Sequence, residues 1–326
     1  MKAALVTSFD SAPRYVEAPE PVASGDAPMV VDVVAAGLHP RVRSQAQGSH
    51  YTSDGVLPLV PGVDGVGRGS DGELRYFVLP DTTAGSMADR IAIDPRRSVV
   101  LPPDSDTLAV AAGMNPAMSS WVALRRRVEL PAGAHVLVLG ATGSAGRLAV
   151  QVARLLGAEQ VVAAGRDAAR LALLPGLGAT DVVRLSGDAD EDADHLGAAA
   201  SDVDIVLDYL WGAPTAAAMT SVVTRRSDRG KPLTWVEIGS VAGPAAAIPS
   251  AALRAARLQL VGSGQGSVST REIVAELPAL AQHLTDGTLT DGTLAVDPRP
   301  VPLRDVERVW AEPDRDGRRT VLVPAA

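Results

Sequence analysis

A glycine-rich segment, VLVLGATGSAGRLAV, runs from Val136 to Val150 and limits the possible folds more than any other part of the sequence. An unbroken apolar run enters it, and Gly140, Gly143 and Gly146 then follow at intervals of three. An amphipathic stretch comes next and ends at Gly157. The apolar run is typical of a buried strand, and the amphipathic stretch is typical of a helix packed on one side. The segment therefore predicts a buried strand, a tight turn and a helix.

Further short apolar segments follow this unit and are separated by helical or loop segments. Such alternation predicts an α/β fold with a parallel, doubly wound sheet of the Rossmann type. Besides the strand at 135–139, the predicted strands are 160–165, 181–185, 204–210, 234–240 and 258–264.

The three glycines have separate tasks in a strand–turn–helix unit of this kind. Gly140 permits the sharp exit from the strand, Gly143 lets backbone N–H groups approach a pyrophosphate, and Gly146 lets the helix pack closely on the sheet. The N-terminus of the helix adds N–H groups without partners and a partial positive charge, which favour an anion. We therefore expect a dinucleotide on the whole turn, which also contains Ala141, Thr142, Ser144 and Ala145. A flexible glycine-rich joint is the alternative, and a phosphate-binding P-loop is excluded because no Gly-Lys-Ser/Thr follows.

The end of the second predicted strand, AAGRDAAR, indicates which dinucleotide is bound. Gly165 leaves room there, and Arg166 follows with Arg170 close by. A guanidinium offers a two-pronged donor for a 2′-phosphate, which favours NADPH. Asp167 leaves NADH open, since a carboxylate at this place accepts a hydrogen bond from the ribose 2′-OH. An exposed surface side chain is the alternative role of Arg166.

The regions on either side of this alternating part have a different texture. The first hundred or so residues contain short Val- and Ile-rich strands and few helical periods. A helical segment follows from about Asp106 and closes on a turn signal, LPAG. Near the C-terminus, Ser269 and Glu272 have the spacing of a capping box at the start of a helix. The closing RRTVLVP reads as a strand that rejoins the N-terminal β region.

Composition excludes several classes of function. The chain of 326 residues has no cysteine, so disulfides, thiol nucleophiles and thiolate zinc sites are excluded. The formal net charge of −8 makes nucleic acid an unfavourable partner. No signal peptide or membrane-spanning run is found, so we expect a cytoplasmic protein without membrane contact. The acidic stretch at 187–195 lacks the glycine and the glutamate of a calcium loop, and we interpret it as a solvated loop.

The chain resembles the zinc-independent, quinone oxidoreductase-like branch of the medium-chain dehydrogenase/reductases. The resemblance covers almost the whole length, and its most specific block is PAGAHVLVLGATGSAGRLAVQVARLLGA at 131–158. It also rests on MKAALVT, VDVVAAGLHP, LPLVPGVDGVGR, MSSWVAL, EIGSVAGP and GRRTVLVP. It implies a Rossmann-type dinucleotide-binding domain at 114–264, inserted into a β-rich, GroES-like catalytic domain at 1–113 and 265–326. A homodimer that continues the sheet through the edge strand LQLVG is a further implication.

The resemblance implies catalysis without a metal ion. The positions of the zinc ligands of zinc-dependent relatives are occupied here by His39, Val63 and Asn115, and valine cannot bind a metal. Hydride addition to a quinone or an α,β-unsaturated carbonyl compound (an enone) is compatible with this, since one donor or a water meets the charge that develops on oxygen. The expected activity is therefore NADPH-dependent reduction of a quinone or enone. The alternatives are a non-catalytic NADPH-binding protein and an alcohol dehydrogenase-like enzyme.

The resemblance also places residues around the reacting groups. Tyr51 or its neighbour His50 corresponds to a tyrosine at the cleft, and His39 stands where relatives have an asparagine near the nicotinamide. An ordinary loop aromatic and a packed neutral histidine are the alternative interpretations. Ser119 matches a threonine near the nicotinamide, with helix N-capping as its alternative. Positions at two strand ends are expected to flank the nicotinamide and ribose: Gly239, Ser240, Gly262 and Ser263. Tyr209 and Trp211 either stack on the cofactor or, as we expect, cover the sheet edge.

Overall fold

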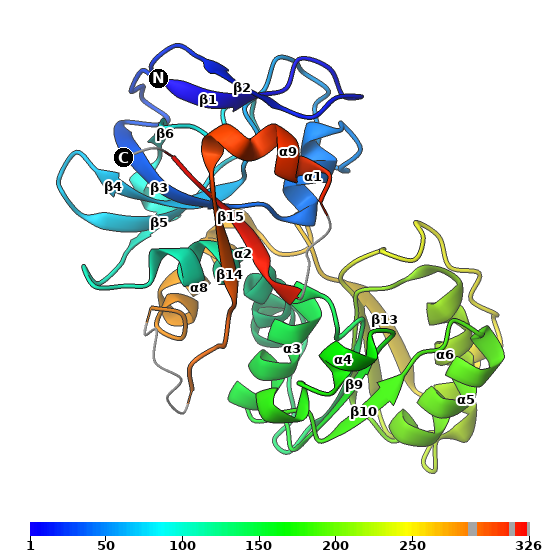
Figure 1. Cartoon of the computed structure of the whole chain (residues 1–326). Coiled ribbons are helices and arrows are strands. Elements are labelled where there is room, and N and C mark those ends of the chain that lie inside the picture. Colours follow the sequence, from blue (N-terminus) through cyan, green and yellow to red (C-terminus); the bar gives the residue numbers. More distant parts are fainter. Residues whose placement is uncertain (286–291, 313–316, 325–326) are drawn as a thin grey trace. The chain divides into compact units, whose positions relative to one another are not determined.

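The computed structural model describes residues 1–285, 292–312 and 317–324. The chain forms two compact units (Figure 1). Unit 1 comprises Met1–Asn115 and Val274–Ala326, and unit 2 comprises Pro116–Ile273. The chain passes from unit 1 to unit 2 within helix α2 (Thr107–Val122), which a π-helical turn, η2 (Ala123–Arg127), extends. It returns within helix α8 (Thr270–Ala281), whose start carries the predicted capping box.

Unit 2 contains a six-stranded parallel sheet, which confirms the predicted doubly wound fold. The strand order is β10-β9-β8-β11-β12-β13, so the direction of winding reverses between β8 and β11. Ligands of such sheets bind beyond the carboxyl ends of the strands at this switch point. The strands are β8 (His135–Leu139), β9 (Gln160–Gly165), β10 (Asp181–Arg184), β11 (Ile205–Asp208), β12 (Leu233–Glu237) and β13 (Leu258–Gly262).

Helices cover the sheet because alternate strand residues point to opposite faces. Leu137, Val206 and Trp235 belong to one apolar cluster, which they share with residues of helices α5 and α6. Helix α3 instead contacts β8 and β9. The helices of unit 2 are α3 (Ser144–Leu155), α4 (Ala168–Leu171), the 3-10 turn η3 (Pro175–Leu177), α5 (Ala189–Ala200), α6 (Gly212–Arg225) and α7 (Ala252–Ala255).

The acidic stretch at 187–195 was predicted to be a loop, and this prediction is wrong from Ala189 onward. Helix α5 begins there, and the side chain of Asp188 accepts hydrogen bonds from the N–H groups of Asp190 and Glu191. A cap of this kind satisfies free N–H groups, and acidic residues in the first turn are stabilised by the positive end of the helix. The clustered acids therefore start a helix instead of preventing one.

Unit 1 is rich in β structure, as predicted. Strands β1 (Lys2–Leu5) and β2 (Arg14–Glu17) form an antiparallel pair. A seven-stranded sheet has the order β14-β15-β3-β4-β5-β7, with β6 paired to β3. Its strands are β3 (Met29–Gly37), β4 (Asp64–Gly69), β5 (Leu74–Val78), β6 (Arg90–Ile93), β7 (Ser98–Val100), β14 (Pro298–Pro302) and β15 (Arg319–Val323).

The C-terminal strand returns to the N-terminal sheet, which confirms the prediction for the closing segment. Val321 of β15 lies opposite Gly37 of β3 in antiparallel pairing. The sequence did not indicate helix α1 (Pro40–Ala46), which begins after His39 with a proline at its first position. In the described part of unit 1, the other short helices with assigned bounds are η1 (Pro95–Arg97), η4 (Leu303–Asp305) and α9 (Val306–Trp310).

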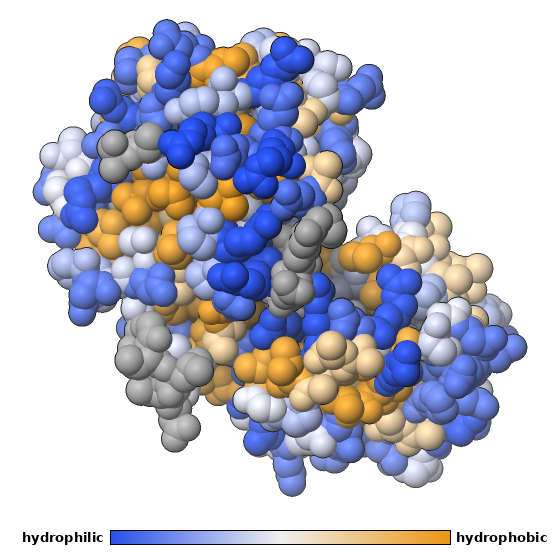
Figure 2. Space-filling view, in the orientation of Figure 1, coloured by the Kyte–Doolittle hydropathy of each residue, from blue (hydrophilic) through white to orange (hydrophobic). Residues whose placement is uncertain are grey.

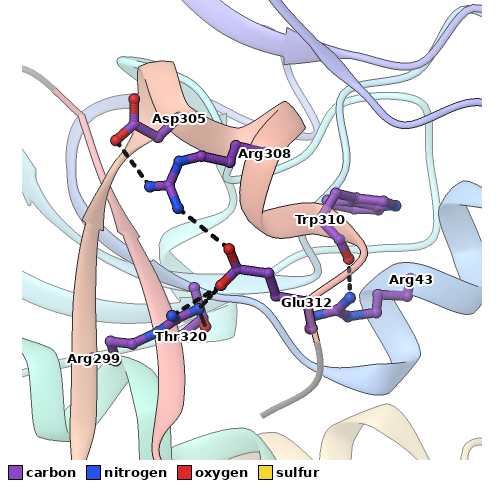
Figure 3. A network of polar contacts seen from close by, with 7 residues as sticks. All are labelled: Arg43, Arg299, Asp305, Arg308, Trp310, Glu312 and Thr320. Atoms are coloured by element: carbon purple, nitrogen blue, oxygen red, sulfur yellow. Dashed lines mark hydrogen bonds and ion pairs between the residues drawn. The ribbon is translucent and has the colours of Figure 1, made fainter. Parts of the chain in front are cut away.

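A polar network fixes helix α9 to the rest of unit 1 (Figure 3). Glu312 accepts hydrogen bonds from Arg299 at 2.9 and 3.0 Å and from Arg308 at 3.2 Å. Arg43 of α1 donates to the carbonyl groups of Trp310 and Glu312, at and just beyond the C-terminal end of α9. A cation such as Arg43 is favoured at this end of a helix. Through Arg43, Glu312 and Arg299, the network joins α1, α9 and β14.

The surface of both units mixes hydrophilic and apolar residues on the face drawn in Figure 2. Among the residues that the structure describes, none of the helices has the length and apolar character needed to span a membrane.

Candidate dinucleotide site

The three glycines of the turn lie in different local environments. Gly140 has φ +88°, and the N–H groups of Gly140 and Ala141 donate to the carbonyl of Ala164 on β9 at 3.0 and 2.8 Å. A Cβ at residue 146 would lie 2.2 Å from the carbonyl oxygen of Gly140 and 2.7 Å from the Cα of Ala141. The absent side chain of Gly146 thus makes room for the turn itself. Gly143 is exposed, and a Cβ on it would come no closer than 3.4 Å to the carbonyl oxygen of Gly140.

The N-terminus of helix α3 is left uncapped. Gly143 occupies the N-cap position and provides no side-chain hydrogen bond. Within the described residues, the N–H groups of Ser144, Ala145 and Gly146 have no acceptor. N–H groups without partners at a helix N-terminus bind anions, and a pyrophosphate supplies the acceptors that they lack. The turn therefore fits a dinucleotide.

The end of β9 separates the roles of Arg166 and Asp167. Asp167 caps helix α4 by accepting from the N–H of Arg170 at 3.0 Å, and its other oxygen lies 3.3 Å from the Arg170 guanidinium. Arg170 also donates to the carbonyl of Thr142 at 3.3 Å, so it connects the glycine turn to α4. Arg166 is exposed and has no partner among the described residues. The free charge at this strand end is therefore a cation, while the nearby carboxylate is already engaged.

Gly165 is required by its surroundings. A Cβ at this position would lie 2.6 Å from Cγ2 and 2.7 Å from Oγ1 of Thr142. The absence of a side chain therefore lets Thr142 of the glycine turn approach the end of β9.

A buried carboxylate organises the carboxyl end of β11. Asp208 is fully buried and accepts from the N–H groups of Leu210 and Trp211 at 2.8 and 3.0 Å. It also accepts from Thr215 Oγ1 at 2.6 Å and from Trp235 Nε1 at 2.9 Å. Buried carboxylates are costly unless they are hydrogen-bonded, and these four donors satisfy both oxygens. The loop between β11 and α6 is consequently held in one conformation at the switch point.

Tyr209 follows Asp208 and lies among the predicted cofactor residues. A Cβ on Gly140 would lie 3.2 Å from the Tyr209 Cβ, and one on Gly239 would lie 3.3 Å from the Tyr209 carbonyl oxygen. The Tyr209 hydroxyl is 2.9 Å from Ser119 Oγ. β11 lies in the middle of the strand order, so Tyr209 does not cover an outer strand of the sheet, and the expectation that it covers a sheet edge is wrong in this sense. Ser119 lies inside helix α2, so its alternative role as an N-cap is wrong as well.

The ends of β12 and β13 supply the remaining predicted positions. The N–H of Gly239 donates to the carbonyl of Asp208 at 3.1 Å, and Ser240 is exposed beside it. The carbonyl of Gly262 accepts from Arg127 Nε at 2.7 Å, and Ser263 is buried. These positions therefore lie with the glycine turn at the carboxyl edge of the sheet.

Glu237, the last residue of β12, is a second acidic residue at this edge. Burial raises the pKa of this half-buried carboxyl group, and the nearby Asp208 raises it further. Sequence reasoning did not select Asp208 or Glu237. The available signal was an acidic residue at the end of an apolar strand, as in DIVLD and TWVE.

Tyr51 and His50 lie together in unit 1, in the loop after α1. Their rings are stacked with centroids 4.5 Å apart, and Tyr51 is 70% exposed. His50 Nδ1 is 2.7 Å from Thr52 Oγ1 and accepts from the Thr52 N–H at 3.3 Å. Burial lowers the pKa of His50, and the Arg41 guanidinium lowers it further. His50 is therefore a neutral ring near pH 7 whose Nε2 carries the proton.

His39 is buried in unit 1, with 2% of its surface exposed. Its Nε2 lies 3.5 Å from Asp64 Oδ1, beyond hydrogen-bonding distance, and neither ring nitrogen has a hydrogen-bond partner in the part of the chain that the structure describes. Tyr76 donates to the other oxygen of Asp64 at 2.7 Å. Burial raises the pKa of Tyr76 well above its ordinary value, so it remains a donor. This environment matches a packed histidine.

Within the described residues, no group of three or more histidine, aspartate or glutamate side chains is arranged to hold a metal ion.

Comparison with known proteins gives full-length matches. No protein-family model matches the chain. A probable NADPH-dependent quinone reductase of Emericella nidulans is 32% identical over an alignment of 367 residues, which covers 99% of this chain and 100% of that protein. The chloroplastic NADPH-dependent alkenal/one oxidoreductase of Arabidopsis thaliana is 28% identical over 65% of this chain and 63% of its own.

A solved structure shares the fold. The quinone oxidoreductase of Thermus thermophilus, which was also solved in complex with NADPH, matches with a TM-score of 0.79. The match covers 99% of this chain and 100% of the other at 24% identity.

Proposed function

This chain belongs to the quinone-oxidoreductase-like medium-chain dehydrogenase/reductases, and we propose that it uses NADPH to reduce a quinone or an α,β-unsaturated carbonyl compound. Two relatives with NADPH-dependent quinone and alkenal/one activities in their names support the reaction class. The observation that carries the cofactor proposal is the glycine turn beside a free Arg166, with Asp167 engaged in capping α4.

The residues of unit 2 bind and orient the cofactor in this proposal. Bound NADPH supplies a hydride to an electron-poor carbon of the acceptor. The free N–H groups of Ser144, Ala145 and Gly146 hold the pyrophosphate at the start of α3. Arg166 neutralises the 2′-phosphate, and Arg170 fixes the turn through Thr142. Gly239, Ser240, Gly262 and Ser263 flank the nicotinamide half at the ends of β12 and β13.

The groups that meet the acceptor oxygen are proposed from unit 1. Neutral His50 offers an Nε2–H donor, and the exposed Tyr51 offers a hydroxyl. Either donor stabilises the negative charge that develops on a carbonyl oxygen during hydride addition. His39 remains a third candidate proton carrier, although its burial favours a structural role. We propose that no zinc takes part, because Val63 offers no ligand and the chain has no cysteine.

We also propose a homodimer built through β13. This strand is at the end of the sheet, and Gln259 and Leu260 on it are exposed. An apolar edge strand with unpaired backbone groups is suited to pairing with a second copy. Light scattering coupled to gel filtration measures the mass, and a monomer at assay concentrations contradicts this part of the proposal.

Arg166→Ala tests the cofactor proposal. Removing a charge-assisted hydrogen bond to phosphate weakens NADPH binding by about tenfold to a hundredfold and leaves NADH binding unchanged. The dissociation constants of both are measured by titration of nicotinamide fluorescence. Arg257→Ala is the matched control, since Arg257 is exposed just before β13, at the opposite edge of the sheet. An unchanged ratio of the two constants in Arg166→Ala contradicts the NADPH assignment.

Turnover tests the reaction itself. The wild-type protein is expected to oxidise NADPH with simple quinones or with a panel of enones. Tight NADPH binding without oxidation by any of these acceptors would instead identify a non-catalytic NADPH-binding protein.

A further inference from the structure

Two neighbouring polar groups determine whether the hydroxyl group of Ser119, a predicted nicotinamide contact, donates or accepts a hydrogen bond. Ser119 Oγ is 2.7 Å from the carbonyl oxygen of Pro116 and 2.9 Å from the hydroxyl of Tyr209. A carbonyl oxygen only accepts, so the single proton of Ser119 is directed to Pro116. Tyr209 must then be the donor in its contact with Ser119.

The environment of Tyr209 keeps it in the donating state. Burial raises the pKa of its hydroxyl to about 12, so the group remains protonated throughout the physiological range. Its backbone is fixed on both sides, because Asp208 holds the following loop and the Tyr209 N–H donates to the carbonyl of Leu139 at 3.1 Å. The donor is therefore available at all times and is held in one place.

These two contacts determine what a ligand finds at Ser119. The serine oxygen has used its proton on Pro116 and one lone pair on Tyr209, so one lone pair remains. Ser119 is partly exposed, whereas Tyr209 is buried. Ser119 thus presents an acceptor and no donor, and it pairs with a ligand group that carries a hydrogen.

We infer that Tyr209 is a positioning residue, which holds the Ser119 oxygen in place as a hydrogen-bond acceptor for the carboxamide NH2 of the nicotinamide. The inference rests on the proposed function, since it requires NADPH at the carboxyl edge of the sheet. The location supports it, because Tyr209 lies against both Gly140 of the turn and Gly239 at the end of β12. The carboxamide NH2 is the hydrogen-bond donor that the nicotinamide ring carries, so it matches the acceptor at Ser119.

A cofactor analogue makes the inference testable by binding alone. The 3-acetylpyridine analogue of NADP has a methyl group in place of the carboxamide NH2. Calorimetric titration gives the dissociation constants of NADP and of this analogue for the wild type and for each variant. Ser119→Ala is expected to lower the preference for NADP by about threefold to tenfold, the value of one neutral hydrogen bond. Ser119→Thr keeps the hydroxyl group and the wild-type preference.

Tyr209→Phe tests the positioning role. Without the tyrosine donor, one of the two hydrogen bonds that hold the Ser119 oxygen in place is lost, so the preference for NADP over the analogue falls while binding of the analogue is unchanged. A purely structural role would weaken both ligands equally. A wild-type preference in Tyr209→Phe or in Ser119→Ala overturns the inference. Should Tyr209→Phe fail to fold in a thermal melt, the comparison of Ser119→Ala with Ser119→Thr decides. Failure of the wild type to bind NADP at all would instead overturn the proposed function.

Discussion

The third glycine of the turn gives the most direct test of the structural reasoning. In Gly146→Ala the new Cβ would lie 2.2 Å from the carbonyl oxygen of Gly140 and 2.7 Å from the Cα of Ala141. An ordinary contact begins at 3.4 Å, so the turn or the helix must move by roughly 1.2 Å (3.4 minus 2.2). Both contacted atoms belong to the backbone and cannot rotate away. The same movement stretches the bonds from Gly140 and Ala141 to Ala164, at 3.0 and 2.8 Å.

The expected cost is at the upper end of overpacking penalties, about 3 kcal/mol in the free energy of unfolding. For a unit of this size that corresponds to a fall of roughly 6–12 °C in the melting temperature. Urea denaturation followed by tryptophan fluorescence measures the loss, because Trp235 is buried in the core of unit 2. NADPH affinity is expected to fall as well, since the turn that we propose to bind the pyrophosphate is displaced.

Two alanine controls separate crowding from the loss of a glycine as such. Gly176 has no atom within 4 Å of an added Cβ, so Gly176→Ala is expected to be neutral or to stabilise by about 0.5 kcal/mol. A Cβ on Gly143 meets nothing closer than 3.4 Å, so Gly143→Ala should fold normally. If Gly143 admits the pyrophosphate, Gly143→Ala nevertheless binds NADPH more weakly. Equal stability of Gly146→Ala and Gly176→Ala would refute the packing argument.

Two further predictions concern stability. Arg226 is buried and donates to the carbonyls of Ser201 and Val203 at 2.8 and 2.9 Å. Arg226→Leu should therefore lower the free energy of unfolding by about 3 kcal/mol in urea denaturation. Arg254 is exposed, so Arg254→Leu should change this free energy by less than about 0.5 kcal/mol. Glu237 has a raised pKa, so its contribution is fully present below the ordinary value of 4.5 and is lost as pH rises through the higher folded-state pKa. In a series of unfolding curves, Glu237→Gln should therefore gain stability relative to the wild type as the pH rises through that window and keep the gain above it, and an identical pH dependence of the two proteins would contradict this.

The adenosine half of the candidate site could be predicted from the sequence because its contacts are local. One strand–turn–helix–strand unit contains Gly140, Gly146 and Arg166. Within such a unit, the spacing in the sequence determines which residues come into contact. The acidic stretch at 187–195 misled for the opposite reason. Its charge suggested a solvated loop, but Asp188 as a cap and the helix dipole convert the same charge into a helix start. The acidic composition of this stretch indicates that it is solvated, but the position of the acidic residues at a helix N-terminus determines that it is helical.

The nicotinamide half could be predicted only in part, because its contacts join residues that are distant in sequence. Ser119 and Tyr209 are 90 positions apart, and their contact depends on the order of strands in the sheet. The same order brings Trp235 Nε1 within hydrogen-bonding distance of Asp208, so that an acidic residue at the end of an apolar strand becomes a satisfied carboxylate. The motif could suggest that Ser119 lies near the ring, but it could not say whether the serine donates or accepts.

The carboxyl edge of the sheet combines two ways of holding polar groups. At the start of α3 the N–H groups are left without acceptors among the described residues, and that deficit is what suits them to a phosphate. At the end of β11 the opposite holds, because four donors satisfy both oxygens of Asp208. Asp208 holds the loop that follows Tyr209, and the Tyr209 hydroxyl in turn contacts Ser119. The N–H groups at the start of α3 are donors without acceptors, so they can bind a phosphate directly. The network at β11 has a single remaining acceptor, the free lone pair of Ser119. We propose that the first provides affinity for any dinucleotide and that the second distinguishes a carboxamide from its analogues.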